Sequence, residues 1–235
     1  MTAPAWAFPV EAPLPYAEGL RLQQAAHAAR VRGEIPDVFF LLQHTPTVTI
    51  GRRGRTEHLS LPAEEYARRG IELVQASRGG DVTFHGPGQW VLYPILHLGT
   101  TGADSHGYLW NLEEIALRVC AAFGARAWRR EGKSGAWTAA GKVAAIGFHI
   151  RRGVTLHGMS FNVAGDLHGF RTIVPCGLTG EPVATLADAL PGRPPPALAA
   201  VGDTLLEQAG SVLGRAIRIF KPGEPSPLPF PIASA

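Results

Sequence analysis

The pattern of apolar and polar residues divides the chain into short strands and a few helices. Apolar residues recur at helical spacing in three segments, which predicts amphipathic helices over residues 16–32, 112–123 and 198–213. Short apolar runs bounded by turn residues predict buried strands over residues 38–43, 47–50, 71–75 and 89–98. Because strands and helices are intermixed without a regular β–α–β repeat, we expect an α+β fold with a mixed or antiparallel sheet.

Local residues support the ends of two predicted helices. Gly33 follows the first helix and Gly124 the second, where a glycine commonly ends a helix. The second helix is expected to begin at the capping pair Asn111 and Glu114.

Two strand-like runs in the second half of the chain predict a β-hairpin. Residues 142–152 and 154–163 meet at Arg152-Gly153, a dipeptide suited to a two-residue turn. This register places Gly147 opposite Gly158. Two facing glycines either leave a notch in which a ligand chain lies against the backbone, or they serve the twist or a bulge of the ladder.

The organisation of the chain indicates one main unit and a tail. Its 235 residues suit one large domain or at most two small ones. Proline breaks the chain in residues 191–196, and five more prolines follow Lys221. The last segment cannot be helical, so we expect a domain over residues 1–220 and an extended, loosely held tail over residues 221–235.

Composition narrows the class of protein. With 46% hydrophobic and 17% charged residues, the chain can build a core and is not disordered. The first sixteen residues lack the pattern of a signal peptide, and no apolar run is long enough to span a bilayer. Two cysteines give no disulfide framework. These features predict a cytoplasmic protein that does not bind membranes.

The basic residues are nearly all arginine, and many come in short clusters. The net charge is only +3. The clusters are either a solvated surface or a positive rim for an acidic partner, and their members include Arg52, Arg53, Arg55, Arg68, Arg69, Arg129, Arg130, Arg151 and Arg152. Nucleic acid is not an expected partner, because the basic groups lack interleaved aromatic residues and any binding motif.

Cysteine is the scarcest reactive residue in the sequence. Cys120 lies on the apolar stripe of a predicted helix and is expected in the core. Cys176, between Pro175 and Gly177, lies in a loop or sharp turn, where it is either a nucleophile or a buried structural thiol. A free thiol with a pKa of about 8.5 needs a nearby cation to be ionised at neutral pH. Lys142, at the start of the hairpin, can supply that cation or be a surface charge.

The histidines do not indicate a metal site, because His149, His157 and His168 lack metal-ligand spacing. His85 belongs to a glycine-rich string whose backbone N–H groups can approach a carbonyl or an oxyanion closely. The string reads Arg78-Gly79-Gly80-Asp81-Val82-Thr83-Phe84-His85-Gly86-Pro87-Gly88-Gln89.

Three blocks together carry a family resemblance. They are the string above with residues 141–147, the segment Thr155-Leu156-His157-Gly158, and Pro175-Cys176-Gly177. In this order they resemble the octanoyl-carrier-protein to protein N-octanoyltransferases, which start protein lipoylation. The resemblance covers residues 16–190 and implies the single-domain fold, with a mixed sheet, of the biotin and lipoate ligases.

The resemblance also implies roles for individual residues. Cys176 would be the acyl-thioester nucleophile, and Lys142 would lower the pKa of its thiol and shuttle protons. The acyl site would be lined by Arg78, Gly79, Gly80, Asp81, Val82, Thr83, Phe84, His85, Ala145, Ile146, Gly147, Gly158, Met159 and Ser160. Two positions depart from the family pattern, with Phe84 where Tyr is common and Ser160 where Ala is frequent.

The implied chemistry is thioester exchange followed by transfer to an amine. It needs neither ATP nor another cofactor, because octanoyl-acyl carrier protein is already activated, and the acceptors would be lysines of lipoyl domains. Two other functions are compatible with the pattern. They are an ATP-dependent lipoate or biotin ligase of the same fold, and a non-catalytic module that binds acyl groups or partners.

Overall fold

The computed structural model describes residues 3–100, 104–166, 168–174, 180–221 and 223–232. Its helices are α1 (Tyr16–Val31), α2 (Ala63–Arg68), α3 (Ser105–Ala122) and α4 (Leu198–Leu213), with short 3₁₀ turns at Thr56–His58, Leu98–Thr100 and His168–Thr172. Its strands are β1 (Ala3–Leu14), β2 (Asp37–His44), β3 (Thr47–Ile50), β4 (Glu72–Gln75), β5 (Val82–His85), β6 (Gln89–Ile95), β7 (Trp128–Arg130), β8 (Lys133–Thr138), β9 (Gly141–Arg151), β10 (Val154–Asn162) and β11 (Arg215–Ile219).

The strands form two sheets. The large sheet has the order β11-β1-β2-β6-β10-β9-β8-β7, and the small sheet has the order β4-β3-β5. In the large sheet β11, β1 and β2 run parallel, whereas β2, β6, β10, β9, β8 and β7 alternate in direction. This mixed sheet confirms the α+β class.

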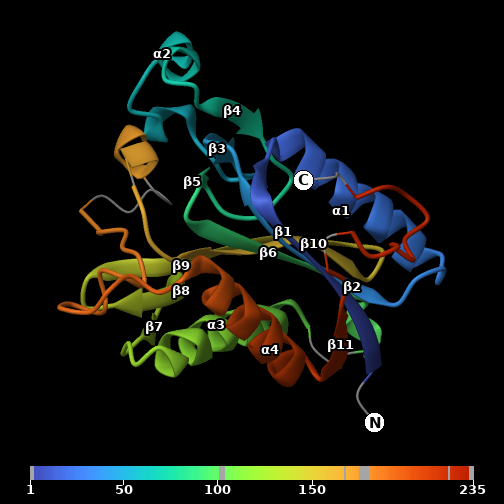
Figure 1. Ribbon diagram of the computed structural model, residues 1–235. Helices are drawn as coiled ribbons and strands as arrows, with labels where there is room; N and C mark the ends of the chain where they lie inside the picture. The colour runs from blue at the N-terminus through green and yellow to red at the C-terminus, as the bar shows by residue number, and fades with distance from the viewer. Residues whose placement is uncertain (1–2, 101–103, 167, 175–179, 222, 233–235) are drawn as a thin grey trace.

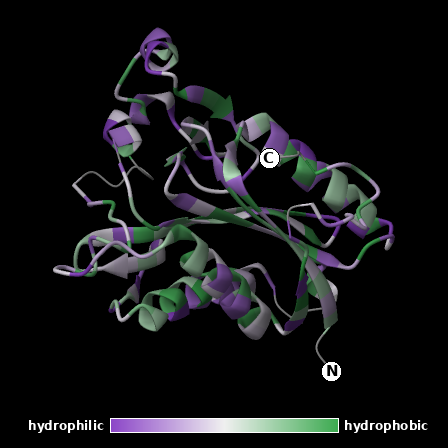
Figure 2. Ribbon diagram, viewed as in Figure 1, coloured by the Kyte–Doolittle hydropathy of each residue, from purple (hydrophilic) through white to green (hydrophobic). Residues whose placement is uncertain are grey.

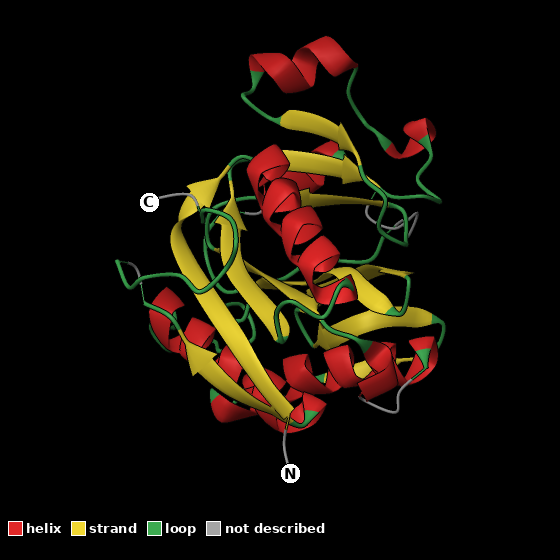
Figure 3. Ribbon diagram, turned by 90° about the vertical axis from the view of Figure 1, so that its right-hand side faces the viewer, coloured by secondary structure: helices red, strands yellow, loops and turns green. Residues whose placement is uncertain are grey.

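The large sheet is covered on both faces. α3 and α4 pack on one face, and α1 lies on the other face beside the small sheet (Figures 1 and 3). Because both faces are covered, all residues of β2, β6 and β10 are buried. α3 and α4 each contain both hydrophobic and hydrophilic residues (Figure 2), as expected for helices that pack one face on a core.

The expected hairpin is confirmed. β9 and β10 pair antiparallel with Gly147 opposite Gly158. The turn residues Arg152 and Gly153 have φ angles of 51° and 74°, the left-handed conformation that a two-residue hairpin turn requires.

The expected start of the second helix is wrong. α3 begins at Ser105, and the carboxylate of Asp104 accepts hydrogen bonds from the backbone N–H groups of His106 and Gly107, at 3.1 and 2.8 Å. Asn111 lies inside the helix, and Glu114 pairs instead with Arg118 at 2.9 Å and with Arg129. The apolar stripe marked the buried part of the helix and missed its more polar first turn.

Asp37, at the start of β2, joins distant parts of the fold. Its buried carboxylate accepts hydrogen bonds from Arg30 in α1 and Arg215 in β11, each at 2.7 Å, and from the backbone N–H of His97 at 3.0 Å. One carboxylate therefore connects α1, β2, β11 and the chain after β6.

The segment after Lys221 crosses the α1 side of the large sheet. Leu228 is buried there, and Phe230 and Ile232 pack against the same core. Arg21 of α1 donates a hydrogen bond to the carbonyl of Pro231 at 2.9 Å. Across the described ranges, no helix has the length and apolar character needed to cross a bilayer.

Candidate active site

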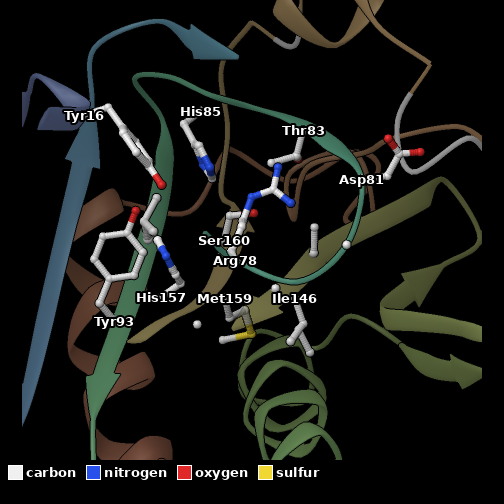
Figure 4. A pocket seen from close by; sticks show the side chains of 15 residues that line it. Tyr16, Arg78, Asp81, Thr83, His85, Tyr93, Ile146, His157, Met159 and Ser160 are labelled. Carbon is white, nitrogen blue, oxygen red and sulfur yellow. The ribbon is translucent and has the colours of Figure 1, made fainter. Parts of the chain in front are cut away.

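A pocket lies between the large sheet and the small sheet. The sheet strands β6, β9 and β10 contribute one part of its lining, while α1, β5 and the turn before β5 contribute the rest (Figure 4). Its lining residues are Tyr16, Arg78, Gly80, Asp81, Thr83, His85, Val91, Tyr93, Ala145, Ile146, Gly147, His157, Gly158, Met159 and Ser160.

The pocket borders a local opening in the β6–β10 ladder. The two strands pair from Asn162–Gln89 to Met159–Leu92 and are joined again where Thr155 N–H bonds Leu96 O at 3.0 Å. Between these points lies Pro94, which has no N–H to donate. The sheet therefore separates beside the pocket.

Side chains satisfy part of the freed backbone. The N–H of His157 donates to Oε1 of Gln23 in α1 at 2.7 Å, and the Thr155 hydroxyl donates to the carbonyl of Pro94 at 2.6 Å. His157 has a φ of 58°, which is uncommon for a residue other than glycine. Strained residues of this kind cluster at functional sites, where the surrounding structure holds them in place.

The turn before β5 closes one side of the pocket and is fixed by hydrogen bonds. Buried Arg78 donates to the carbonyl of Thr49 at 2.6 Å, and Gly79 N–H donates to the carbonyl of Phe148 at 2.9 Å. A Cβ added to Gly147 would lie 2.8 Å from the carbonyl oxygen of Gly79. Gly147 is therefore needed for this close approach of two backbones.

The facing glycines line the pocket, but the open notch expected between them is wrong. The turn at Gly79 fills the space beside Gly147, and a Cβ on Gly158 would meet the backbone of Leu92 in β6. The pocket next to the pair is shaped by side chains from β5, β6 and α1.

Buried tyrosines and histidines form one wall of the pocket (Figure 4). His44, behind this wall, bonds Leu14 O through Nδ1 at 3.1 Å and the Tyr93 hydroxyl through Nε2 at 2.8 Å. His85 bonds Oε1 of Gln89 through Nδ1 at 2.7 Å. These bonds fix the rings that face the pocket.

Burial keeps this wall uncharged. It lowers the pKa of His44 to about 4 and that of His85 well below its usual value. Burial, helped by the charge of Arg78, lowers the pKa of His157 to about 3, and burial raises the pKa of Tyr16 to about 12. At neutral pH the rings are therefore neutral, which suits contact with an uncharged ligand.

The structure brings together most of the residues that the sequence selects. Three of them do not line the pocket: Gly79 holds the turn, while Val82 and Phe84 pack in the core of the small sheet. Four lining residues were missed: Tyr16, Val91, Tyr93 and His157. Only His157 had a signal in the sequence, because it adjoins Gly158 in a motif block.

Lys142 lies at the start of β9, three residues before Ala145 of the pocket. Its side chain is buried, with Nζ 5.4 Å from the ring centroid of Trp137. Cys176, Pro175 and Gly177 lie outside the described residues. The flanks of that segment are described: Val174 N–H bonds His58 O at 2.8 Å, and Val183 pairs with Lys142.

Most of the arginine clusters are neutralised within the chain. Arg69 pairs with Glu65 at 2.7 Å, and Arg130 pairs with Glu181 at 2.6 Å. Arg55, Arg68 and Arg129 also have acidic partners. Among the described residues, Arg52, Arg53, Arg151 and Arg152 have no such partner and are exposed.

Comparison with known proteins identifies the family. The lipoyl protein ligase A/B catalytic domain model matches residues 15–210. This chain belongs to that family. An octanoyltransferase from Geobacter metallireducens is 42% identical over 217 residues, which cover 91% of this chain and 96% of that protein. An octanoyltransferase from Chloroflexus aurantiacus is 42% identical over 207 residues, covering 87% and 92%.

Solved structures share the fold. A lipoate-protein ligase A bound with ATP has a TM-score of 0.77 at 16% identity, covering 94% of this chain and 90% of that one. A bipartite lipoate protein ligase with its E2 lipoyl domain from Thermoplasma acidophilum has a TM-score of 0.74 at 18% identity, covering 94% and 88%. The expected relation to the lipoate ligase fold is confirmed.

Proposed function

We propose that this chain is an octanoyltransferase that moves an octanoyl group from acyl carrier protein to a lysine of a lipoyl domain. The observation that carries the proposal is the agreement between identity and site. Relatives named octanoyltransferase are 42% identical over nearly their whole length. Most of the residues that line the pocket come from the motif blocks that carry this resemblance.

The pocket suits a medium-length acyl chain. Ala145, Ile146, Gly147, Met159 and Val91 offer an apolar surface, and the wall opposite is neutral. Burying each methylene contributes roughly 0.8 kcal/mol, so an octanoyl chain can gain several kcal/mol before ordering costs.

The reaction is two acyl transfers through Cys176. The Cys176 thiolate attacks the carbonyl carbon of the carrier thioester, forms a new carbon–sulfur bond and expels the carrier thiolate, which takes up a proton. The acceptor lysine amine then attacks the enzyme thioester and loses a proton as the Cys176 thiolate leaves. The formation of the enzyme thioester needs no ATP, because one thioester replaces another.

Lys142 is proposed to serve the same thiol. The chain that carries Cys176 returns to β9, where Val183 pairs with Lys142. A cation beside a thiol lowers the pKa of that thiol, and a lysine can also accept and return a proton. In this proposal Lys142 favours the Cys176 thiolate and moves the proton of the lysine acceptor.

The proposal predicts an acyl-enzyme that intact mass can detect. Mixing the protein with octanoyl carrier protein should add one octanoyl group, and Cys176→Ser should abolish both this adduct and the transfer. Cys120→Ala is the matched control, because Cys120 is fully buried and burial raises its thiol pKa to about 12. Full transfer by Cys176→Ser would exclude the mechanism. Octanoylation only with free octanoate and ATP would indicate a ligase instead.

Lys142 has a separate test. Lys142→Met should raise the pKa of the Cys176 thiol, and the pH profile of alkylation by iodoacetamide measures that pKa. Lys142→Arg keeps the charge but cannot release a proton, so it should retain the low thiol pKa and still transfer slowly. An unchanged alkylation profile in Lys142→Met would show that Lys142 does not activate the thiol.

A further inference from the structure

A second cavity lies next to the acyl pocket, and one hydrogen bond crosses from one to the other. We call it the basic groove, and it is lined by Gln24, His27, Ala28, Val31, Arg32, Ser77, His149, Arg151, Arg152 and Leu156. Ser77 lines the groove and His157 lines the pocket. The Ser77 hydroxyl and Nε2 of His157 are 2.9 Å apart. This pair therefore stands between the two cavities.

The strained backbone of His157 directs its ring to this position. Met159 and Phe161 of β10 belong to the core beneath α3 and α4, and strict alternation would turn His157 the same way. The ring instead meets Tyr93 edge-on, with centroids 6.2 Å apart, on the α1 side of the sheet. The left-handed φ of 58° takes His157 out of the alternation.

The His157 ring is not used elsewhere in the described structure. Its exposed fraction is 1%, and Nδ1 has no hydrogen-bond partner among the residues that the structure describes. The ring is therefore held by Ser77 and by packing on Tyr93. A buried, strained and incompletely satisfied side chain at a pocket is a feature that packing alone does not favour.

The register places His157 at the end of the pocket far from Lys142. Starting from Lys142, the ladder passes Ala145–Ser160, Ile146–Met159 and Gly147–Gly158 before it reaches Phe148–His157. Strands rise roughly 3.4 Å per residue, so Ala145 to Phe148 spans about 10 Å. An extended chain with bonds of about 1.5 Å meeting at about 111° advances roughly 1.25 Å per bond, so the seven bonds of an octanoyl chain span about 9 Å.

We propose that His157, held by Ser77, is the end wall of the acyl pocket and sets the longest acyl chain that the protein accepts. The proposal rests on the function proposed above, because it takes the pocket to hold the acyl group with its thioester toward Lys142. A chain longer than octanoyl would have to pass the His157 ring. Beyond the ring it would meet Leu156, Val31 and Ala28 of the basic groove.

The decisive variant is His157→Gly, which removes the ring and relieves the left-handed backbone. Donor competition measures the effect: octanoyl, decanoyl and dodecanoyl carrier proteins are mixed in equal amounts, and the mass of the acyl-enzyme reports which chain is bound. We expect the ratio of dodecanoyl-enzyme to octanoyl-enzyme to rise at least tenfold over the wild type. His157→Asn, which tolerates a positive φ and keeps a shorter side chain, should raise the ratio less.

The matched control is His149→Ala. His149 is on the same hairpin, opposite Leu156, and lines only the basic groove, so its loss should leave the wild-type ratio unchanged. If His157→Gly does not fold, the donor competition with His157→Asn tests the end wall instead. A folded His157 variant that forms octanoyl-enzyme with the wild-type ratio overturns the end wall. A wild-type protein that forms no acyl-enzyme at all overturns the proposed function instead.

Discussion

At the residue scale, the pocket wall depends on histidines that stay neutral. An imidazole in an unfolded chain has a pKa of about 6.5, whereas burial lowers the pKa of His44 to about 4 in the folded chain. Below about pH 6.5 the unfolded state therefore binds a proton that the folded state does not bind. The stabilising contribution of a neutral His44 is complete above that pH and is lost as the pH falls toward about 4.

This linkage gives a pH-dependent prediction for His44→Gln. The wild type should lose roughly 1.4 kcal/mol of unfolding free energy per pH unit from this one group between about pH 6.5 and 4. The variant lacks that loss, so the stability gap between the two proteins should narrow as the pH falls. Urea unfolding at pH 7.5, 6.0 and 5.0 measures the gap. A gap that stays constant would show that His44 titrates alike in both states.

The sequence identified the glycines that line the pocket better than the aromatic residues that line it. Gly147 and Gly158 followed from a turn dipeptide and pairing arithmetic, which are local. The sequence did not predict what fills the space beside Gly147, because the turn at Gly79 comes from a distant part of the chain. From the sequence, Tyr16 was predicted only as the start of a helix and Tyr93 only as a strand residue. They meet at the pocket because the fold brings α1 over β6.

At the scale of elements, the β9–β10 hairpin was predicted from the sequence, whereas the equally local pairing of β8 with β7 and with β9 was not. The β9–β10 hairpin was found because its turn and register are encoded within twenty or so neighbouring residues. The strand β1 was missed because Pro4, Pro9 and Pro13 argue against a strand. It is a central strand nonetheless, since β11 and β2 both pair with it.

The start of α3 offers a direct comparison of two capping candidates. Asp104→Ala removes the acceptor of the hydrogen bonds from His106 and Gly107, and it should cost about 1 kcal/mol of unfolding free energy. Asn111→Ala, at the position favoured by the apolar pattern, should cost little, because Asn111 is inside the helix and alanine has the higher helix propensity. Thermal and urea unfolding of both variants measure the difference. A larger cost at Asn111 would contradict this assignment of the cap.

At the scale of the whole molecule, Asp37 and Arg215 link two strands of the large sheet, β2 and β11, that are far apart in the sequence. Both side chains are 3% exposed, and the pair adjoins Arg30 and the chain after β6. Removing Arg215 leaves the buried carboxylate of Asp37 with Arg30 as its remaining ion-pair partner among the described residues. A buried charge that loses part of its compensation in this way is destabilising. Losing this pair should therefore lower the unfolding free energy of the whole fold.

Two arginines of β11 allow this to be measured. Arg215→Ala should lower the unfolding free energy by roughly 3–5 kcal/mol, the range for breaking a buried pair. Arg218→Ala, on the same strand, removes only a partly exposed guanidinium stacked 4.4 Å from the ring centroid of Phe220, so its cost should be about 1 kcal/mol or less. Urea unfolding of both variants measures the costs. Equal costs would mean that the buried pair adds nothing specific.

The parallel pairing of β1 with β11 also has a consequence for synthesis on the ribosome. β11 follows β1 in the sequence after four helices and nine other strands, so one side of β1 has no partner strand until β11 has been made. An open strand edge is a template on which another nascent chain can pair. Proline lacks an N–H, so Pro4, Pro9 and Pro13 remove donors from that waiting strand. We therefore expect these prolines to make β1 a poorer template for pairing with another chain.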